Sequence, residues 1–251
     1  MIHHRHVQSY TGDHGTILAD LGLRPETPKL PAPANNLCCL VVDVGYSFTH
    51  VTPFFEDYKL NYAIRRLNVG GKVLTNYLKE IVSFRHFNMM DQTYLMSLIK
   101  ERLCFVSEHI EEDLKKCKSR KSELRKNYVL PDQTSSILGF VLGTQPTAND
   151  LPKSATQNGM DVDLMEDRTP DEAQVLSLGN ERFSVPEVLF HPSDLGINQA
   201  GISETIVQSI MACPEYLREA MCANIVIVGG SAAIPGLCPR ILSELRQMLP
   251  A

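Results

Sequence analysis

The sequence predicts an α/β fold, and two apolar stretches followed by helical patterns carry this prediction. In residues 40–50, Leu40-Val41-Val42 is a short apolar run typical of a buried strand. In residues 224–236, the continuous run Ile225-Val226-Ile227-Val228 fits a strand buried on both faces, as in a parallel sheet covered by helices. After both stretches, apolar residues recur at the three- and four-residue spacing of amphipathic helices.

The first stretch has the features of a phosphate-binding hairpin. Asp43 ends the first strand, Gly45 allows a tight turn, and residues 48–52 resume as a second strand. Such a hairpin presents backbone N–H groups to a phosphate and places its acid beside a bound metal ion. A surface hairpin with one solvated aspartate explains the same residues and remains an alternative.

The second stretch ends in Gly229-Gly230-Ser231, with a helix expected from about Pro235. A strand, a glycine pair and a helix in this order let the backbone lie flat against a nucleotide. Glycine pairs also occur in simple tight turns, so this motif has two interpretations.

Size and charge limit the classes of function. The 251 residues suffice for one sizeable core or two small ones. The formal net charge of −5 argues against nonspecific nucleic-acid binding, because such binders are basic. No apolar run reaches membrane-spanning length, and no hydrophobic signal region opens the chain. We therefore expect no membrane partner and no direct sequence-specific nucleic-acid binding.

The seven cysteines are odd in number and form no C-x-x-C pair. They signal neither a disulfide framework nor a zinc site. Most have apolar neighbours, where free cysteine behaves as a small hydrophobic residue. This usage is typical of a reducing compartment, the cytosol or the nucleus.

Residues 1–37 are predicted to be a poorly ordered leader, because the proline-rich stretch 24–33 is typical of an extended linker. Its histidines lack the spacing of a metal site. A third strand is expected at residues 53–58. The sequence predicts helices at residues 73–82, 92–107, 202–211, 215–221 and 241–249.

Residues 108–126 carry mixed charges and predict an exposed helix or loop. Residues 133–174 are polar, weakly periodic and acidic towards their end, and we expect them to be a largely disordered insertion. Their acidity suits a basic partner such as a histone, although surface solubility explains it equally well. The core subdomain is predicted at 38–71 and 197–251, with an inserted helical subdomain at 72–196.

Taken together, these pieces resemble the actin family over roughly residues 38–249. The matching motifs are Asp43-Val44-Gly45 with Thr49-His50, Gly70-Gly71, Lys100-Glu101-Arg102-Leu103-Cys104, Asn180-Glu181-Arg182-Phe183 with Pro186-Glu187 and Leu189-Phe190, Ala200-Gly201-Ile202 with Glu204, and Gly229-Gly230-Ser231 with Pro235-Gly236. Their order and spacing are much more specific than any single motif. The resemblance implies the fold shared by actin, heat-shock 70 proteins and sugar kinases, a ribonuclease H-like α/β fold.

Within the family, the chain is similar to the actin-related protein 6 branch. This similarity lies in Gly71-Lys72, in residues 75–80, in Cys104-Phe105-Val106-Ser107 and in residues 194–201. The branch implies a nuclear structural subunit of a Swr-type chromatin remodeller, which exchanges a variant histone into nucleosomes. Remodeller subunits and, through the complex, histones are then the expected partners, and the nucleus the expected location, with the cytoplasm in addition.

The resemblance also implies a site for ATP or ADP with magnesium. Its positions are Asp43, Gly45, Tyr46 and Ser47 at the phosphates, with Asp43 at the metal, Gly71 at the ribose side, Lys100 and Glu101 beside ribose and base, and Gly229, Gly230 and Ser231 at the base and phosphate. From the residues alone, Lys100 and Glu101 are equally explained as solvated charges on a helix surface. Tyr46 stands where the family has an acid. A phenol, with a pKa of about 10, is neutral at pH 7 and cannot replace that carboxylate as a base.

The matched residues resemble only the larger half of the actin fold, which implies a truncated or alternatively spliced chain or an incomplete gene model. We therefore expect no catalytic residues and no meaningful ATP hydrolysis. Three functions follow from the sequence: a structural actin-related subunit, an actin-like nucleotide-binding protein or ATPase, and a nonfunctional fragment.

Overall fold

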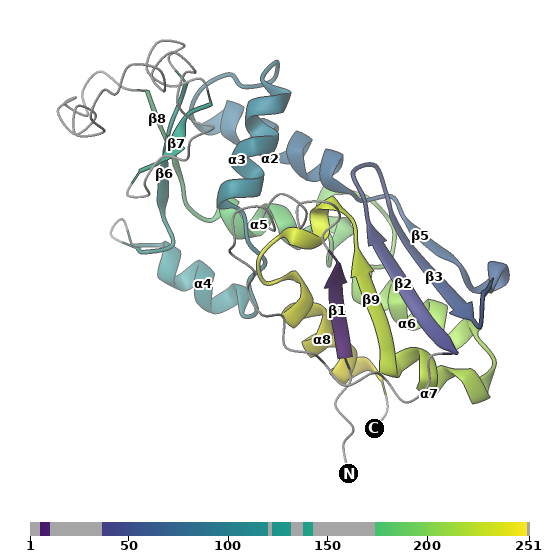
Figure 1. Cartoon of the computed structure of the whole chain (residues 1–251). Coiled ribbons are helices and arrows are strands. Elements are labelled where there is room, and N and C mark those ends of the chain that lie inside the picture. Colours follow the sequence, from purple (N-terminus) through teal and green to yellow (C-terminus); the bar gives the residue numbers. More distant parts are fainter. Residues whose placement is uncertain (1–5, 11–36, 120–121, 132–137, 143–173, 250–251) are drawn as a thin grey trace, which may run out of the picture. The chain divides into compact units, whose positions relative to one another are not determined.

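The computed structural model describes residues 6–10, 37–119, 122–131, 138–142 and 174–249 (Figure 1). The chain divides into two compact units. Unit 1 consists of Met1–Asn76, Phe105–Glu108 and Val185–Ala251, and unit 2 of Tyr77–Cys104 and His109–Ser184. No described helix is long and apolar enough to cross a membrane.

Unit 1 is built on a mixed sheet with the strand order β1-β9-β2-β3-β4, and β5 also pairs with β3. Its strands are β1 (His6–Tyr10), β2 (Cys38–Val44), β3 (Thr49–Phe55), β4 (Tyr58–Lys59), β5 (Arg65–Leu67) and β9 (Asn224–Val228). β9 lies between β1 and β2 and is parallel to both, whereas β2 and β3 form an antiparallel hairpin. This hairpin confirms the predicted strand–turn–strand pattern.

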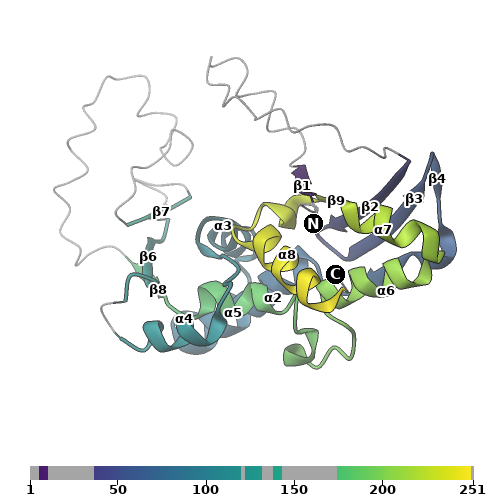
Figure 2. The same ribbon diagram turned by 90° about the horizontal axis from the view of Figure 1, so that it is seen from below.

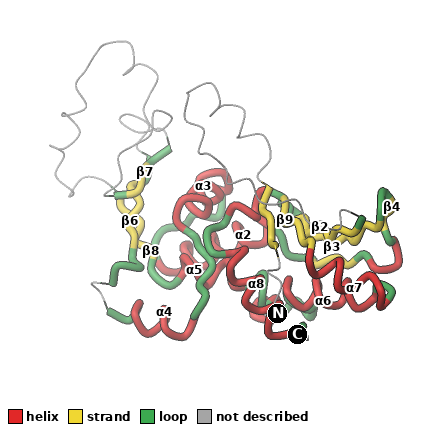
Figure 3. The backbone as a smooth tube through the Cα atoms, turned by 60° about the horizontal axis from the view of Figure 1, so that its bottom comes forward, coloured by secondary structure: helices red, strands yellow, loops and turns green. Residues whose placement is uncertain are grey.

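Helices cover one face of this sheet. They are α6 (Ile202–Ala212), α7 (Glu215–Ala223) and α8 (Leu237–Met248), which lie together on the same side of the strands (Figures 2 and 3). Along β2, the fully buried residues Leu40, Val42 and Val44 alternate with more exposed ones. The core of unit 1 therefore lies between this face and the three helices.

Unit 2 combines helices with a small antiparallel sheet of strand order β7-β6-β8. Its elements are α3 (Thr93–Leu103), α4 (Ile110–Cys117), β6 (Lys126–Val129), β7 (Phe140–Val141) and β8 (Val175–Leu178). Two helices are shared between the units, α2 (Gly71–Arg85) and α5 (Glu181–Glu187). In unit 2, the fully buried Tyr128 donates its hydroxyl hydrogen to the Leu138 carbonyl oxygen at 2.7 Å.

The structure corrects the prediction for the leader. Residues 6–10 form β1, which pairs in parallel with β9 from His6↔Asn224 to Tyr10↔Val228. This pairing uses backbone hydrogen bonds to a strand more than two hundred residues away, which no local pattern reveals. The remaining residues of the predicted leader, apart from Leu37, lie outside the described residues.

The prediction that residues 225–228 are buried on both faces is wrong. In β9, Ile225 and Ile227 are buried, whereas Val226 and Val228 are only half-buried. β9 is parallel to its neighbours, as predicted, but the helices α6, α7 and α8 lie on a single face of its sheet. A continuous apolar run thus does not distinguish one covered face from two.

The insertion also differs from its prediction. The first unit boundary falls after Asn76 rather than at residue 71, residues 105–108 return to unit 1, and the second boundary falls before Val185 rather than at residue 197. Besides helices, unit 2 holds a three-stranded sheet. The strand β7 lies within the stretch 133–174 that was predicted to be disordered. The rest of that stretch lies outside the described residues, except residues 138, 139, 142 and 174.

Candidate functional site

The tip of the β2–β3 hairpin forms the centre of the candidate site. Asp43 and Val44 are the last residues of β2, and they pair with His50 and Thr49 of β3. The Asp43 side chain is exposed, as are Tyr46 and Ser47 in the turn. The hairpin therefore presents one carboxylate and one phenol to solvent at the same end of the sheet.

Backbone hydrogen bonds fix the tip. The Gly45 N–H donates to the Phe48 carbonyl oxygen at 3.1 Å and closes the turn. At the start of α2, the N–H of Gly71 donates to the Gly45 carbonyl oxygen at 3.0 Å, and that of Lys72 to the Tyr46 carbonyl oxygen at 2.7 Å. The amides of Gly45 and Gly71 are thus already used. Among the described residues, the amides of Tyr46 and Ser47 have no acceptor and remain available for an anion.

Two glycines let other segments reach the hairpin closely. A Cβ atom at position 70 would lie 2.6 Å from the Tyr46 carbonyl oxygen and 2.8 Å from the Phe48 nitrogen. A Cβ atom at position 229 would lie 2.5 Å from the Val44 carbonyl oxygen and 2.7 Å from Asp43 Oδ1. Any side chain at either position would displace the hairpin, so this site requires glycine at both.

Gly229 also has a φ of 100°, which L-residues rarely adopt. It follows the last residue of β9, Val228, and immediately precedes the 3₁₀ helix η4 (Gly230–Ala233). Gly230 is exposed, and no atom lies within 4 Å of the place that a Cβ atom would take there. Ser231, in contrast, is buried, and its Oγ donates to the Gly45 carbonyl oxygen at 3.4 Å. The turn after β9 therefore packs directly against the hairpin tip.

The structure brings together most of the site residues predicted from the sequence. Those in unit 1 are Asp43, Gly45, Tyr46, Ser47, Gly71, Gly229, Gly230 and Ser231, and the contacts above link the hairpin tip to the start of α2 and to the turn after β9. Lys100 and Glu101 belong to α3 in unit 2.

The two residues of α3 have different environments. Glu101 is exposed and accepts a hydrogen bond from Ser97 Oγ at 3.1 Å. Lys100 is buried, and this burial lowers the pKa of its ammonium group, against the opposing effects of Glu101 and Cys104. The interpretation as a solvated surface charge therefore holds for Glu101 and is wrong for Lys100.

Sequence reasoning missed two supports of the site. Thr49 is fully buried and donates its hydroxyl hydrogen to the Val69 carbonyl oxygen at 2.8 Å, which ties β3 to the segment before Gly70. Arg66 lies over the Phe48 ring, with its guanidinium carbon 3.6 Å from the ring centroid. The Gly70-Gly71 pair was the sequence signal for this close packing, but only Gly71 was assigned to the site.

The residues of unit 1 fit a phosphate group with a cation better than they fit a metal site alone. Among the described residues, no three histidine, cysteine or acidic side chains cluster as metal ligands. Asp43 is therefore a single carboxylate, suited to a hydrated Mg²⁺ that phosphate oxygens also hold. The free amides of Tyr46 and Ser47 and the open backbone at Gly230 fit the anionic part of such a ligand.

Comparison with known proteins shows the family that the chain matches. The actin family profile matches residues 32–251. The chain is 43% identical over 231 residues to "Actin-like protein ARP6" of Yarrowia lipolytica, covering 91% of this chain and 54% of that protein. It is 42% identical over 215 residues to "Actin-related protein 6" of Arabidopsis thaliana, covering 85% and 51%, and 40% identical over 217 residues to that of Drosophila melanogaster, covering 86% and 50%.

The chain spans about half the length of the curated relatives it matches. These relatives confirm the branch indicated by the sequence motifs, and the mixed sheet with its helices confirms the predicted α/β fold of the actin type. From its sequence motifs, its fold and these similarities, the chain belongs to the actin family.

Proposed function

We propose that the chain is an actin-related structural subunit of a nuclear Swr-type chromatin-remodelling complex that deposits a variant histone into nucleosomes. The observation that carries the proposal is the hairpin tip. Tyr46, an exposed phenol, takes the place of an acid there, while glycine contacts hold the surrounding backbone in one arrangement. This combination favours binding a ligand without hydrolysing it. Similarity to proteins named actin-like protein ARP6 and actin-related protein 6 supports the actin-related part of the proposal. The remodelling role is what the resemblance to that branch implies.

In this proposal, a bound nucleotide would act as a structural ligand. Asp43 would hold the magnesium ion, the amides of Tyr46 and Ser47 the phosphates, and the backbone at Gly229 and Gly230 the base and phosphate side. The magnesium ion would supply charge neutralisation. Lys100 and Glu101 keep the ribose and base roles that the resemblance implies, and these stay predictions.

The proposed partners are the other remodeller subunits and, through the complex, histones, and the proposed location is the nucleus. The test is affinity purification of the tagged chain from nuclear extract, with quantification of co-purifying proteins by mass spectrometry. We expect the remodeller ATPase subunit and a variant histone to be enriched over a tag-only control. A soluble nuclear chain that never co-purifies with remodeller subunits would overturn the proposal.

The second candidate is an actin-like ATPase, which the exposed Asp43 beside free backbone amides favours. Phosphoryl transfer needs several charged groups positioned at once, and the hairpin tip offers the phenol of Tyr46 where the family has an acid. We expect phosphate release by the purified chain to equal the background. Turnover above background that Asp43→Asn abolishes would favour the ATPase.

A further inference from the structure

A small cavity in unit 1 lies beside the start of α6 and the second half of α8. Its volume is about 260 Å³, and its walls include Phe190, His191, Ser203, Glu204 and residues of the α8 face. Pockets that hold whole small-molecule ligands measure about 300–1,000 Å³. The cavity is therefore of a size for one side chain rather than for a complete cofactor.

The walls of the cavity are fixed by close packing. A side chain at Gly201 would collide with the backbone of Phe190, so these two segments touch directly. The Ile202 N–H donates to the Leu189 carbonyl oxygen at 2.8 Å, where α6 begins. α6 and α8 also pack against each other. The cavity is thus a formed feature of the unit and not a loose surface loop.

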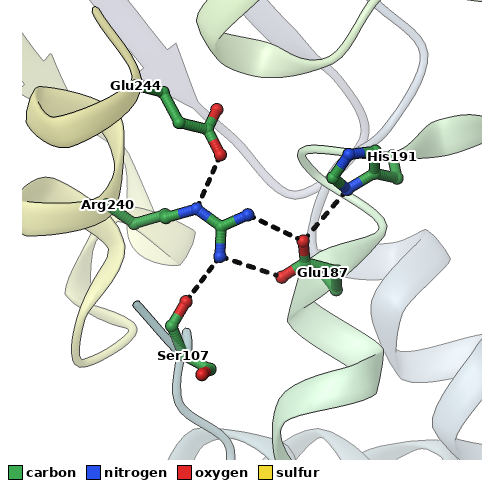
Figure 4. A network of polar contacts seen from close by, with 5 residues as sticks. All are labelled: Ser107, Glu187, His191, Arg240 and Glu244. Carbon is green, nitrogen blue, oxygen red and sulfur yellow. Dashed lines mark hydrogen bonds and ion pairs between the residues drawn. The ribbon is translucent and has the colours of Figure 1, made fainter. Parts of the chain in front are cut away.

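One wall is a buried network around Arg240 (Figure 4). Its Nε donates to Glu244 Oε1 at 2.6 Å, its Nη1 to the Ser107 carbonyl oxygen at 2.6 Å, and its Nη2 to Glu187 Oε1 at 2.9 Å. His191 Nδ1 lies 3.0 Å from the same Glu187 oxygen. The Arg240 guanidinium is therefore committed to neighbours that already balance its charge.

The lining residues of the cavity carry an excess of negative charge. Glu204 and Glu244 are acidic and Arg240 is the one guanidinium among the described lining residues, so their formal charge is −1 with His191 counted as neutral. Glu187, which binds Arg240 behind this wall, adds a further carboxylate to the network. Helix ends do not reverse this sign, because the positive end of α6 at Ile202 is opposed by the negative end of α8 at Met248. The side-chain charges therefore determine the sign of the electrostatic potential in the cavity, and this negative potential favours a cation.

A buried hydroxyl without a partner adds a second, independent observation. Ser203 lines the cavity and is 2% exposed, and its Oγ has no hydrogen-bond partner among the residues the structure describes. Buried polar groups are nearly always paired, and leaving one unpaired is unfavourable. A ligand that donates a hydrogen bond to this oxygen would remove the deficit.

We propose that this cavity binds the side-chain ammonium group of a lysine from a partner protein. An ammonium group has three donors and no acceptor, which matches the Ser203 hydroxyl oxygen and the carboxylates of Glu204 and Glu244. The unbranched lysine stem suits a cavity of side-chain size with Phe190 and Met248 in its walls. The proposal depends on neither the nucleotide site nor the remodelling role.

The test titrates the full chain with the blocked peptide Gly-Ser-Lys-Ser-Gly and follows backbone amides by NMR. We expect saturable shifts at residues 201–204 and 244–248, and none with the same peptide carrying norleucine in place of lysine. Glu204→Gln replaces an exposed side chain by one of similar size and removes one carboxylate, so it should weaken lysine binding about tenfold. The control Glu219→Gln removes an exposed charge on α7, outside the cavity walls, and should leave binding unchanged.

Three results would overturn the proposal. These are equal shifts with the lysine and norleucine peptides, unchanged binding in Glu204→Gln, and saturable shifts at the same amides with inorganic phosphate but not with the lysine peptide. Ser203→Ala serves as a second variant, because removing the unpaired hydroxyl should weaken lysine binding while leaving the fold intact.

Discussion

Gly229 is the residue whose backbone most constrains the candidate site. With a φ of 100° and a would-be Cβ 2.5 Å from the Val44 carbonyl oxygen, Gly229→Ala combines backbone strain with a collision. We expect it to lower the free energy of unfolding by about 1–3 kcal/mol in urea denaturation. Gly230→Ala is the matched control, because nothing lies within 4 Å of its Cβ position, and it should cost less than about 1 kcal/mol. Equal losses in both variants would contradict the assigned role of Gly229.

Cys104 is a single residue that is expected to contribute to the pH dependence of stability. Burial raises the pKa of its thiol to about 12, against an ordinary value of about 8.5. Between these values the folded state keeps a proton that the unfolded state loses, so stability falls as the pH rises through this range. The slope from one such thiol is at most about 1.4 kcal/mol per pH unit.

We therefore expect the unfolding free energy of Cys104→Ala to fall less steeply between pH 8 and pH 9.5 than that of the unmodified chain. Urea titrations at several pH values measure this, and the comparison of slopes removes any constant cost of the lost sulfur. Parallel slopes would show that Cys104 ionises freely in the folded state.

At the scale of elements, the Glu187–Arg240 pair joins the end of α5 to α8. Burial raises the pKa of Glu187 in spite of Arg240 and His191, so desolvation is the larger effect and the carboxylate depends on its partner. Breaking a buried pair by removing one charge costs about 3–5 kcal/mol, and we expect Arg240→Met to destabilise unit 1 by this amount. The exposed pair Glu112–Lys116 offers a control, since Lys116→Met should change stability by less than about 1 kcal/mol.

The double variant Glu187→Met with Arg240→Met separates charge from packing. If the cost of Arg240→Met is mainly an unpaired buried carboxylate, the double variant is more stable than the sum of the single changes predicts. Additive losses would instead assign the cost to lost side-chain packing, including that of Arg240 on the Phe190 ring.

The hairpin tip and the start of α2 are another connection between elements. Gly70→Ala introduces a Cβ 2.6 Å from the Tyr46 carbonyl oxygen without a positive φ, so it tests close contact alone. We expect Gly70→Ala to reduce any stabilisation by Mg-ATP more than Gly196→Ala does. Gly196 has a φ of 71° with open space around it, so its substitution strains only a distant turn.

At the scale of the whole molecule, the proposed nucleotide role predicts ligand-dependent stability. A ligand that binds only the folded state stabilises it by about 2.7 kcal/mol at a hundred times its dissociation constant. We expect a saturable rise in melting temperature with Mg-ATP or Mg-ADP, lost in Asp43→Asn. A cooperative melt with a melting temperature that neither nucleotide changes would contradict nucleotide binding and would keep only the structural role. A nucleotide-dependent rise retained in Asp43→Asn would show that Asp43 does not contribute to the site.

Much of unit 1 could be predicted because its signals are local. Short apolar, β-branched runs marked β2 and β9, and a second strand was expected after the turn at Gly45, where β3 lies. The recurrence of apolar residues marked α6 and α8, and Pro214 marked the start of α7. In the same way, three- and four-residue spacing marked α2, which both units share, and α3 of unit 2. The helix ends were less accurate. The helix predicted to end at residue 107 ends at Leu103. The helix expected from about Pro235 and the helix predicted at residues 241–249 are one helix, α8, which begins at Leu237.

The elements that were missed depend on distant partners. β1 pairs with the edge that β9 offers, and β6, β7 and β8 are short strands that pair across gaps of ten residues or more. Strands this short contain too few residues for their apolar side chains to form a recognisable periodic pattern in the sequence. Likewise, nothing in the order Lys100-Glu101 distinguishes the buried lysine from its exposed neighbour.

Motif order and local periodicity are properties of the chain, so they were enough to predict the family, the α/β class and the residues at the hairpin and the glycine turn. The packing of distant segments was needed to show which amides at the hairpin tip are free, why positions 70 and 229 must be glycine, and that Ser203, Glu204 and Glu244 border one cavity. These facts are distances between segments far apart in the chain, and such distances are fixed by packing, which no local pattern encodes.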